Sequence, residues 1–277
     1  MLVIAAVCLV LVLQPWASNP GEGPRLNDRA LAAAAANRTH AAAWIAAEVS
    51  RGVIVACDPL MCAGLQHDGF PASDLDPLAA STADPLGSGL VVSTVSLRTE
   101  LGARLETVYA PVVLARFGNG QSAVDVRVTA PDGAAAYVAA AHADLLARQQ
   151  DGQQLLHNPK VFFAADCRAQ LAAGYVDSRL LITLAALAHS VPVYVRQFGH
   201  ADPGAPAGTA LRSMTIGGAV PLPRQASYLE FVQAFLRAQR APFLATATVS
   251  GTGAATVLTI AFTAPSPLGL LSAQPLN

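Results

Sequence analysis

The segment VIVACDP, at residues 53–59, is the clearest sign of how the chain folds. Its first four residues are all apolar, which is typical of a short strand buried on both faces of a parallel sheet. Asp58 and Pro59 then predict the start of a helix, because Asp caps a helix N-terminus and Pro fits its first turn. A buried strand that leads directly into a capped helix indicates an α/β fold.

Helices and strands continue to alternate on both sides of this segment. Residues 26–50 have the apolar spacing of a helix, and GLVVS at residues 89–93 predicts a second buried strand. Two apolar runs, at residues 111–117 and 123–128, flank Gly-Asn-Gly, which is typical of a β-hairpin. We therefore predict that residues 27–130 form a Rossmann-like unit, with a mainly parallel sheet and this hairpin at its edge.

The second strand of the hairpin reads VDVRV at residues 124–128. Its valines alternate with Asp125 and Arg127, a pattern that is typical of a strand with one buried face and one wet face. We therefore expect Asp125 and Arg127 to face solvent.

Residues 131–264 predict a second unit, of the α+β type with hairpins. It opens with a long alanine-rich helix that ends near Leu156. Further on, Ser227 and Glu230 match a capping box, which predicts that an amphipathic helix starts at Ser227. The apolar face of that helix would consist of Tyr228, Phe231, Val232 and Phe235. The fold class is therefore α/β with two α/β units, and residues 265–277 are expected to be a frayed tail.

The first 17 residues contain the most apolar segment, LVIAAVCLVLVL at residues 2–13, and no positively charged side chain precedes Arg25. The segment is short for a membrane span of about 20 residues, and it lacks the positive charges of a signal peptide. Three interpretations stay open: an uncleaved membrane anchor, a cleaved signal segment, or the last helix of a longer membrane protein. In each, residues 18–26 are a linker and the body lies outside the cytoplasm, at the cell membrane or secreted.

The overall composition excludes two classes of protein. Hydrophobic residues make up 53% of the chain and charged residues 13%, which is unlike a disordered protein. The net charge is −1 and Lys160 is the only lysine, so the chain lacks the basic patch that binds nucleic acid. We expect no nucleic-acid partner.

The four cysteines leave one pairing to consider. Cys8 lies in the apolar segment, whereas Cys57 and Cys62 are five residues apart. An oxidising compartment would allow these two to form a disulfide, and a reduced pair is the alternative. A zinc site is not expected, because the pair has no second pair or histidines nearby. Cys167 would then be a free, buried thiol.

No sequence motif indicates a catalytic centre. The chain lacks a phosphate-binding P-loop, a G-x-S-x-G nucleophile motif and the histidine spacing of a metalloprotease. Its Gly-x-Gly pairs lie in predicted hairpin turns, which is the wrong context for a dinucleotide site. We therefore predict no catalytic residue, no metal and no cofactor.

Three polar residues are candidates for ligand binding. Asp58 follows a buried strand, at the sheet edge where open α/β sheets bind ligands. Asp177 and Arg179 stand at a predicted helix start and could bind sugar hydroxyls. The alternative is structural in each case: Asp58 caps its helix, and Asp177 caps its own helix while pairing with an arginine.

Three segments together resemble a known family: AAAWIAAEVSRGVIVACDP at residues 41–59, GLVVSTVSLR at 89–98 and LARFGNGQSAVDVRV at 114–128. They resemble the extracytoplasmic C-terminal domain of polytopic membrane glycosyltransferase-like proteins of actinobacteria, and the second half is similar to a related uncharacterised membrane-anchored family. The chain departs from that family because it lacks the multi-helix membrane portion and its acidic catalytic motifs. The resemblance therefore implies a location and not transferase activity.

These observations favour a non-catalytic, membrane-tethered extracytoplasmic domain that binds or scaffolds a cell-envelope component, either a glycan or a membrane partner. One alternative is an envelope hydrolase or glycan-modifying enzyme that uses Asp58, Asp177 and Arg179. Another is a two-lobed solute-binding receptor with a hinge near Ala130.

Overall fold

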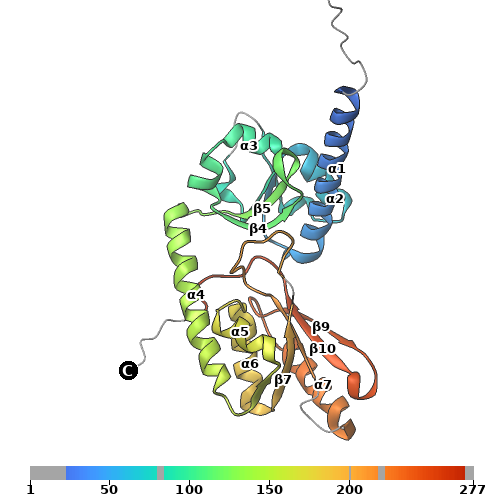
Figure 1. The fold of residues 1–277 in the computed structure, drawn as a ribbon, viewed down its shortest axis with the longest axis vertical. Helices are drawn as coiled ribbons and strands as arrows, with labels where there is room; N and C mark the ends of the chain where they lie inside the picture. Colours follow the sequence, from blue (N-terminus) through green and yellow to red (C-terminus); the bar gives the residue numbers. More distant parts are fainter. Residues whose placement is uncertain (1–22, 80–83, 200, 218–221, 272–277) are drawn as a thin grey trace, which may run out of the picture.

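A computed structural model describes residues 23–79, 84–199, 201–217 and 222–271. In this part of the chain the strands form two five-stranded sheets, one in each half of the sequence. The first unit lies above the second in Figure 1, and the long helix α4 starts at the lower edge of the first unit and runs along the second. The predicted α/β fold with two units is therefore confirmed.

The first unit has a mixed sheet with the strand order β2-β1-β3-β5-β4. Strand β1 is parallel to β2 and β3, whereas β5 is antiparallel to β3 and β4. The parallel strands and the edge hairpin are as the sequence predicts. In chain order the elements are α1 (Gly23–Glu48), β1 (Val55–Cys57), α2 (Pro59–His67), β2 (Leu75–Pro77), β3 (Leu90–Ser93), α3 (Val95–Leu101), β4 (Val112–Phe117) and β5 (Val124–Val128).

Both faces of the first sheet are covered. Helices α1 and α2 pack on one face, where Ile45 and Leu65 are fully buried beside strand residues. The other face is covered by α3 and by a five-residue π-helical turn, Leu105–Tyr109. Leu97 of α3 and Leu105 of the turn are buried there. The first unit is therefore a three-layer α/β/α sandwich.

The prediction that Asp125 and Arg127 face solvent is wrong. Each is only 3% exposed, because the face of β5 that carries them is the one covered by α3 and the π-helical turn. Asp125 accepts two hydrogen bonds from Arg116 and one from Arg127. Arg127 also donates to the carbonyl of Ala110. The charges are buried because they are paired.

The second unit has the strand order β6-β7-β8-β10-β9. Only β6 and β7 are parallel, and the other neighbours are antiparallel. Its elements are α4 (Ala134–Leu156), β6 (Val161–Phe163), α5 (Ala165–Ala172), α6 (Ser178–Ser190), β7 (Val193–Phe198), β8 (Ser213–Ile216), α7 (Leu222–Arg237), β9 (Ala245–Ser250) and β10 (Val257–Phe262).

Helix α7 begins earlier than the capping box predicts. It starts at Leu222, so Ser227 lies inside it, and Pro223 occupies its first turn, where proline is tolerated. Its buried stripe is also displaced from the predicted one, because Phe231 is 41% exposed. The buried residues are Tyr228, Leu229, Val232 and Leu236.

Backbone hydrogen bonds join the two units. The N–H of Ala264 donates to the carbonyl of Glu48 at 2.6 Å, and the N–H of Ser50 donates to the carbonyl of Ala264 at 2.9 Å. The N–H of Arg116 also donates to the carbonyl of Pro203 at 2.7 Å. The chain therefore returns to the first unit after β10 and fixes the junction near residue 264.

The segment that follows is not frayed where the structure describes it. Ser266 donates a hydrogen bond from its hydroxyl to Asp177, and the N–H of Gly269 donates to Asp144 at 3.1 Å. Residues 265–271 are thus bound to the second unit, and residues 272–277 lie outside the described part.

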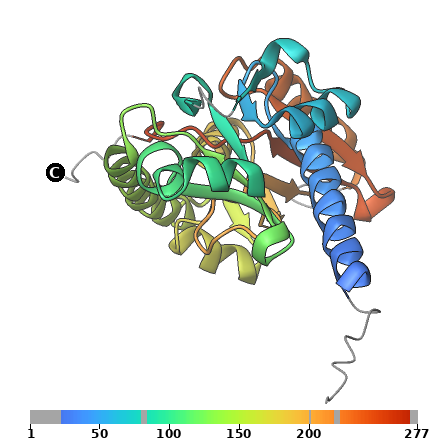
Figure 2. The ribbon, with the colours of Figure 1, turned by 90° about the horizontal axis from the view of Figure 1, so that it is seen from above.

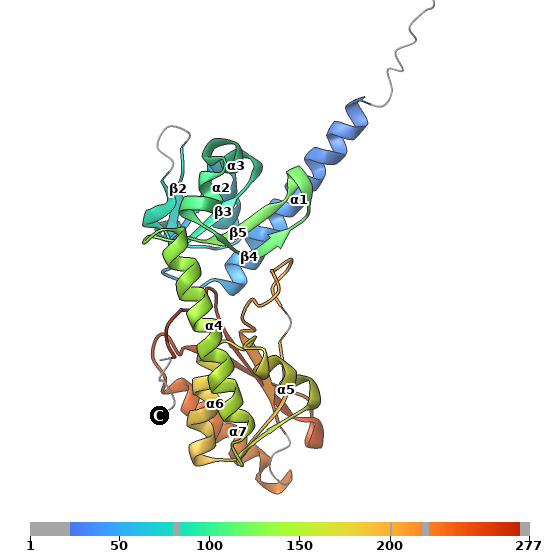
Figure 3. The ribbon, with the colours of Figure 1, turned by 60° about the vertical axis from the view of Figure 1, so that its left-hand side comes forward.

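The predicted anchor or signal segment, residues 1–17, lies outside the described residues, as does most of the predicted linker. Helix α1 begins at Gly23, inside that linker. Its N-terminal half extends away from the body (Figures 2 and 3), and Leu31 there is 69% exposed. None of the helices within the described ranges is long and apolar enough to cross a membrane.

Candidate functional site

Asp58, the first predicted ligand-binding residue, is engaged by its own chain. It is 8% exposed, and one carboxylate oxygen accepts a hydrogen bond from the N–H of Met61 at 2.9 Å. The other oxygen accepts from the hydroxyl of Thr94. Asp58 therefore caps α2 and links it to the start of α3, which is the structural alternative that the sequence left open.

Asp177 and Arg179 are buried together in the second unit, with exposures of 0% and 4%. Their side chains pair at 2.8 Å, and Arg179 also donates to the carbonyl of Thr263 at 3.0 Å. Burial alone would raise the pKa of Asp177, but the hydrogen bonds and charge of Arg179, with help from Ser266, hold it below its usual value. The contacts of Asp58 lie in the first unit, so the structure does not bring the three residues together.

Cys57 and Cys62 form a disulfide, and their Cα atoms are 5.5 Å apart. Cys57 ends β1 and Cys62 lies in α2, so the bridge fastens the strand to the helix that follows it. Cys167 is a buried free thiol whose pKa is raised by burial.

The second sheet has one face that none of the described helices covers, and we call it the open face. The opposite face packs against α5, α6 and α7, so that Val193, Val195, Ile216 and Ile260 are fully buried. Strand pairing places a different set on the open face, and every member is exposed or half-buried. This set is Phe162, Tyr194, Gln197, Ser213, Thr215, Thr246, Thr248, Ser250, Val257, Thr259 and Ala261.

Hydroxyl groups form a row across the open face. Thr248 of β9 pairs with Thr259 of β10, which in turn pairs with Thr215 of β8. The hydroxyls of Thr215 and Thr259 lie 3.2 Å apart, within hydrogen-bond distance. Each hydroxyl can both donate and accept, so the row offers a ligand several hydrogen-bonding partners.

An aromatic pair stands at the opposite side of the open face. Phe162 of β6 is paired with Tyr194 of the parallel strand β7, and Phe162 is 49% exposed. The open face contains no Asp, Glu or Lys; an exposed arginine, Arg196, stands beside it at a bulge in β7. The surface is therefore nearly uncharged and combines hydroxyls with aromatic rings.

A polar notch adjoins the open face where the two units meet. This hollow of about 190 Å³ is lined by Ser213 of the open face and by Trp44, Glu48, Asp202 and Arg212. Arg212 donates to Asp202 at 2.6 Å and to Glu48 at 3.4 Å, and its guanidinium lies 5.9 Å from the centre of the Trp44 ring. The Glu48 side chain is 46% exposed, so its carboxylate can still reach a ligand.

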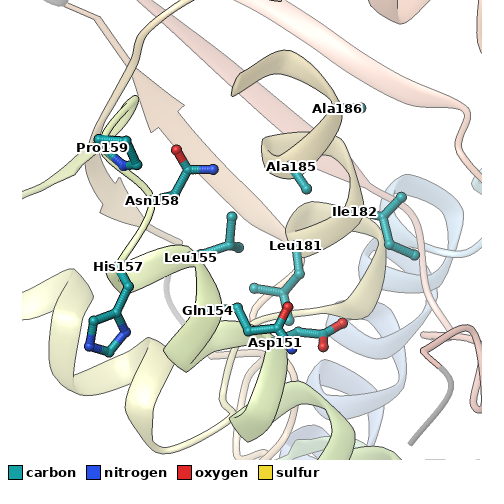
Figure 4. A pocket seen from close by; sticks show the side chains of 10 residues that line it. All are labelled: Asp151, Gln154, Leu155, His157, Asn158, Pro159, Leu181, Ile182, Ala185 and Ala186. Atoms are coloured by element: carbon teal, nitrogen blue, oxygen red, sulfur yellow. The ribbon is translucent and has the colours of Figure 1, made fainter. Parts of the chain in front are cut away.

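A groove of about 620 Å³ lies between the end of α4 and α6 (Figure 4). Its walls are mostly aliphatic, with Leu155, Leu181 and Ile182 among them. Burial raises the pKa of Asp151 here, and His157 is nearby. The lining includes no side-chain hydroxyl or thiol that His157 could activate.

A second hollow, of about 250 Å³, lies between the units. It is lined by Val112 and Leu114 of β4, by the Pro206–Ala210 segment and by Tyr137 of α4. Burial and the charge of Asp144 raise the pKa of Tyr137 to about 12, so its hydroxyl stays protonated. This pocket is apolar with a few polar groups, as small-molecule sites often are.

Within the described residues, no group of three or more His, Cys, Asp or Glu side chains could hold a metal ion. The absence of a metal and of a cofactor stays a prediction.

Sequence reasoning missed both the open face and the notch. Thr248, Thr259 and Thr215 come from three strands that are neighbours only in the folded sheet, and Glu48 and Arg212 come from different units. The local signal was limited to the alternation of alanine with threonine in β9 and to the single threonine of β10. The relation to actinobacterial membrane proteins stays a prediction, since no protein-family model, curated protein or solved structure matches this chain.

Proposed function

We propose that this chain is a non-catalytic, membrane-tethered extracytoplasmic domain that binds a neutral glycan of the cell envelope on the open face of its second sheet. The observation that carries the proposal is the composition of that face: a row of hydroxyls and an exposed aromatic ring on one sheet, without a carboxylate or ammonium group. A neutral, hydroxyl-rich ligand matches such a surface better than a polyanion or a polycation does.

Phe162 supplies the apolar part of the recognition. An aromatic ring has an electron-rich face, which attracts the weakly positive C–H groups on one side of a sugar ring. Phe162 is 49% exposed beside Tyr194, so a sugar can reach it without any rearrangement of the strand.

The threonine row supplies the polar part. Neighbouring strands lie about 4.8 Å apart, so Thr248, Thr259 and Thr215 present hydroxyls at regular intervals across the sheet. A glycan that lies along this row can exchange hydrogen bonds with several of them, while Glu48 of the notch accepts from a sugar hydroxyl at one end.

Two further features support the location and the absence of catalysis. The Cys57–Cys62 disulfide favours an oxidising compartment, and the apolar residues 2–13 favour a tether. Asp58 and Asp177, the acids that an envelope hydrolase would use, already accept hydrogen bonds from their own chain.

The proposal is tested by calorimetric titration of the full-length protein with neutral envelope oligosaccharides. We expect Phe162→Ala to weaken binding at least tenfold, about 1.4 kcal/mol, as for a central aromatic contact. Phe231→Ala is the matched control, because Phe231 is 41% exposed but lies on α7, at the covered face. The proposal fails if no neutral oligosaccharide binds, or if the two variants bind equally well.

The two-lobed receptor is the second candidate, and the pocket of about 250 Å³ between the units favours it. The backbone hydrogen bonds near Ala264 oppose the hinge motion that such a receptor needs. Ala141→Trp would fill that pocket. If Ala141→Trp abolishes binding of the oligosaccharide while Phe162→Ala does not, the pocket is the site and the open face is not.

A further inference from the structure

The four edge strands of the two sheets differ in how they are protected from pairing with another chain. Strands β2 and β6 have only three residues each. Strand β4 carries Arg116, whose backbone N–H donates to Pro203 of the second unit. Short length, charge and a covering segment are the usual means by which sheet edges avoid association.

Within the described residues, strand β9 has none of these protections. Its six residues, ATATVS, contain no charge and no proline, and most of its side chains are exposed. Two exposed apolar residues belong to this edge: Leu244, just before the strand, is 61% exposed, and Val249, within the strand, is 43% exposed. A long, uncharged edge with exposed apolar residues is the kind that pairs with another strand.

We infer that β9 pairs with β9 of a second copy of this chain, antiparallel and about a two-fold axis, and joins the two second sheets into one of ten strands. Two copies of β9 can pair without charge repulsion, because the strand contains no charged residue that would meet its counterpart across the axis. The interface also continues the existing sheet, because the outer backbone groups of β9 gain the partners that an internal strand has.

The register follows from the faces of the strand. Residues that oppose each other across an antiparallel pair must lie on the same face of the sheet. With Ala247 on the axis, Thr246 faces Thr248 of the partner subunit and Ala245 faces Val249 of the partner subunit. Leu244 then faces Ser250 of the partner subunit, so the pairing uses the whole strand up to the turn at Gly251 and covers both exposed apolar residues.

This inference goes beyond the proposed function and does not depend on it. The dimer would make the open face continuous across the axis, because Thr246 and Thr248 lie on that face in both copies. A glycan chain could then contact two second units at once.

Sedimentation velocity of the full-length protein at increasing concentration tests the dimer, with no glycan present. We expect the wild type to dimerise reversibly. In the double variant Thr246→Lys with Thr248→Lys, lysines oppose each other twice across the axis, and the dimer should weaken about tenfold or more. In the double variant Thr246→Glu with Thr248→Lys, opposite charges meet, and the dimer should persist or tighten.

Thr259→Lys is the control on the neighbouring strand, where a charge on the same face leaves the edge unchanged. Circular dichroism establishes that each variant is folded. The inference is overturned if the wild type stays monomeric, or if both double variants associate equally well. A dimer that binds no oligosaccharide would refute only the proposed function, and a monomer that binds oligosaccharide would refute only the dimer.

Discussion

The two sheets have five strands each, but only the second has a face that no helix covers in the part of the chain that the structure describes. In the first sheet, β5 alternates valine with charged residues, and helices nonetheless cover both of its faces. In the second sheet, β9 reads ATATVS, and its polar side, which carries Thr246, Thr248 and Ser250, stays open. The comparison teaches that alternation does not tell whether the polar side of a strand meets water or buried partners.

The difference has a physical cause in each sheet. The charge of Asp125 is matched by Arg116 and Arg127, so a π-helical turn can cover this carboxylate without leaving it unpaired. The threonines of the second sheet need no such partner, because solvent and each other satisfy their hydroxyls. The polar side of the first sheet is therefore buried and helps to hold the first unit together. The polar side of the second sheet stays exposed to solvent.

The largest effect is expected from Asp125→Ala. The substitution leaves Arg116 and Arg127 without their shared carboxylate, and Arg127 is only 3% exposed. We expect the free energy of unfolding to fall by about 3–5 kcal/mol, measured by denaturant titration. Thr248→Ala, on the exposed open face of the second sheet, should change the free energy of unfolding by less than about 0.5 kcal/mol. Equal losses of stability in the two variants would mean that the polar sides of the two sheets contribute equally to the fold.

The next effect concerns the disulfide, which lies only in the first unit. Cys57 and Cys62 are five residues apart, and a loop of that size stabilises a fold by about 2 kcal/mol in the chain-entropy model. We expect a reducing agent to lower the free energy of unfolding by that amount. A Cys57→Ala, Cys62→Ala double variant should not respond to the reductant. A similar response in that variant would trace the effect to another group.

A pH dependence is expected from Asp177. Its pKa is lowered in the folded protein, so the unfolded chain takes up a proton at higher pH than the folded chain does. The stabilisation is therefore complete above the ordinary aspartate pKa of 3.8 and is lost as the pH falls through the lowered value. Denaturant titrations from pH 6 to pH 2 should show a shallower acid loss in Asp177→Asn than in the wild type. Parallel curves for the two proteins would contradict this.

The smallest effect is expected from Thr259→Val. The substitution removes the hydroxyl contact with Thr215 at 3.2 Å but keeps a β-branched side chain on a half-buried site. We expect the free energy of unfolding to stay within about 0.5 kcal/mol of the wild type, while the affinity for the oligosaccharide falls. A large loss of stability instead would show that the threonine row holds the sheet together.

The sequence was sufficient for elements whose signals are local. The strand and capped helix around Asp58 and the Asn-Gly hairpin were predicted within a few residues. Strand β2 was missed, because Leu75–Pro77 is three residues long and contains Asp and Pro, which are rare in strands. It forms because β1 offers it a parallel partner.

The candidate site was beyond the reach of sequence reasoning. Asp177 and Arg179 were chosen as ligand-binding residues because charged residues at a helix start can bind a ligand, but their pairing with the segment after β10 buries them. That segment is 84 residues from Arg179 in sequence. The open face depends in the same way on the long-range register of β8, β9 and β10.

Helix α1 passes without a break from its projecting half into the core, where Ile45 is fully buried. Every residue of an α-helix advances the chain by about 1.5 Å and rotates it by about 100°. One residue inserted at the exposed Ala32 would therefore swing both sheets by about 100° relative to the N-terminal end of the helix. The number of residues in α1 therefore determines the direction in which the threonine row faces, relative to the N-terminal end of the helix.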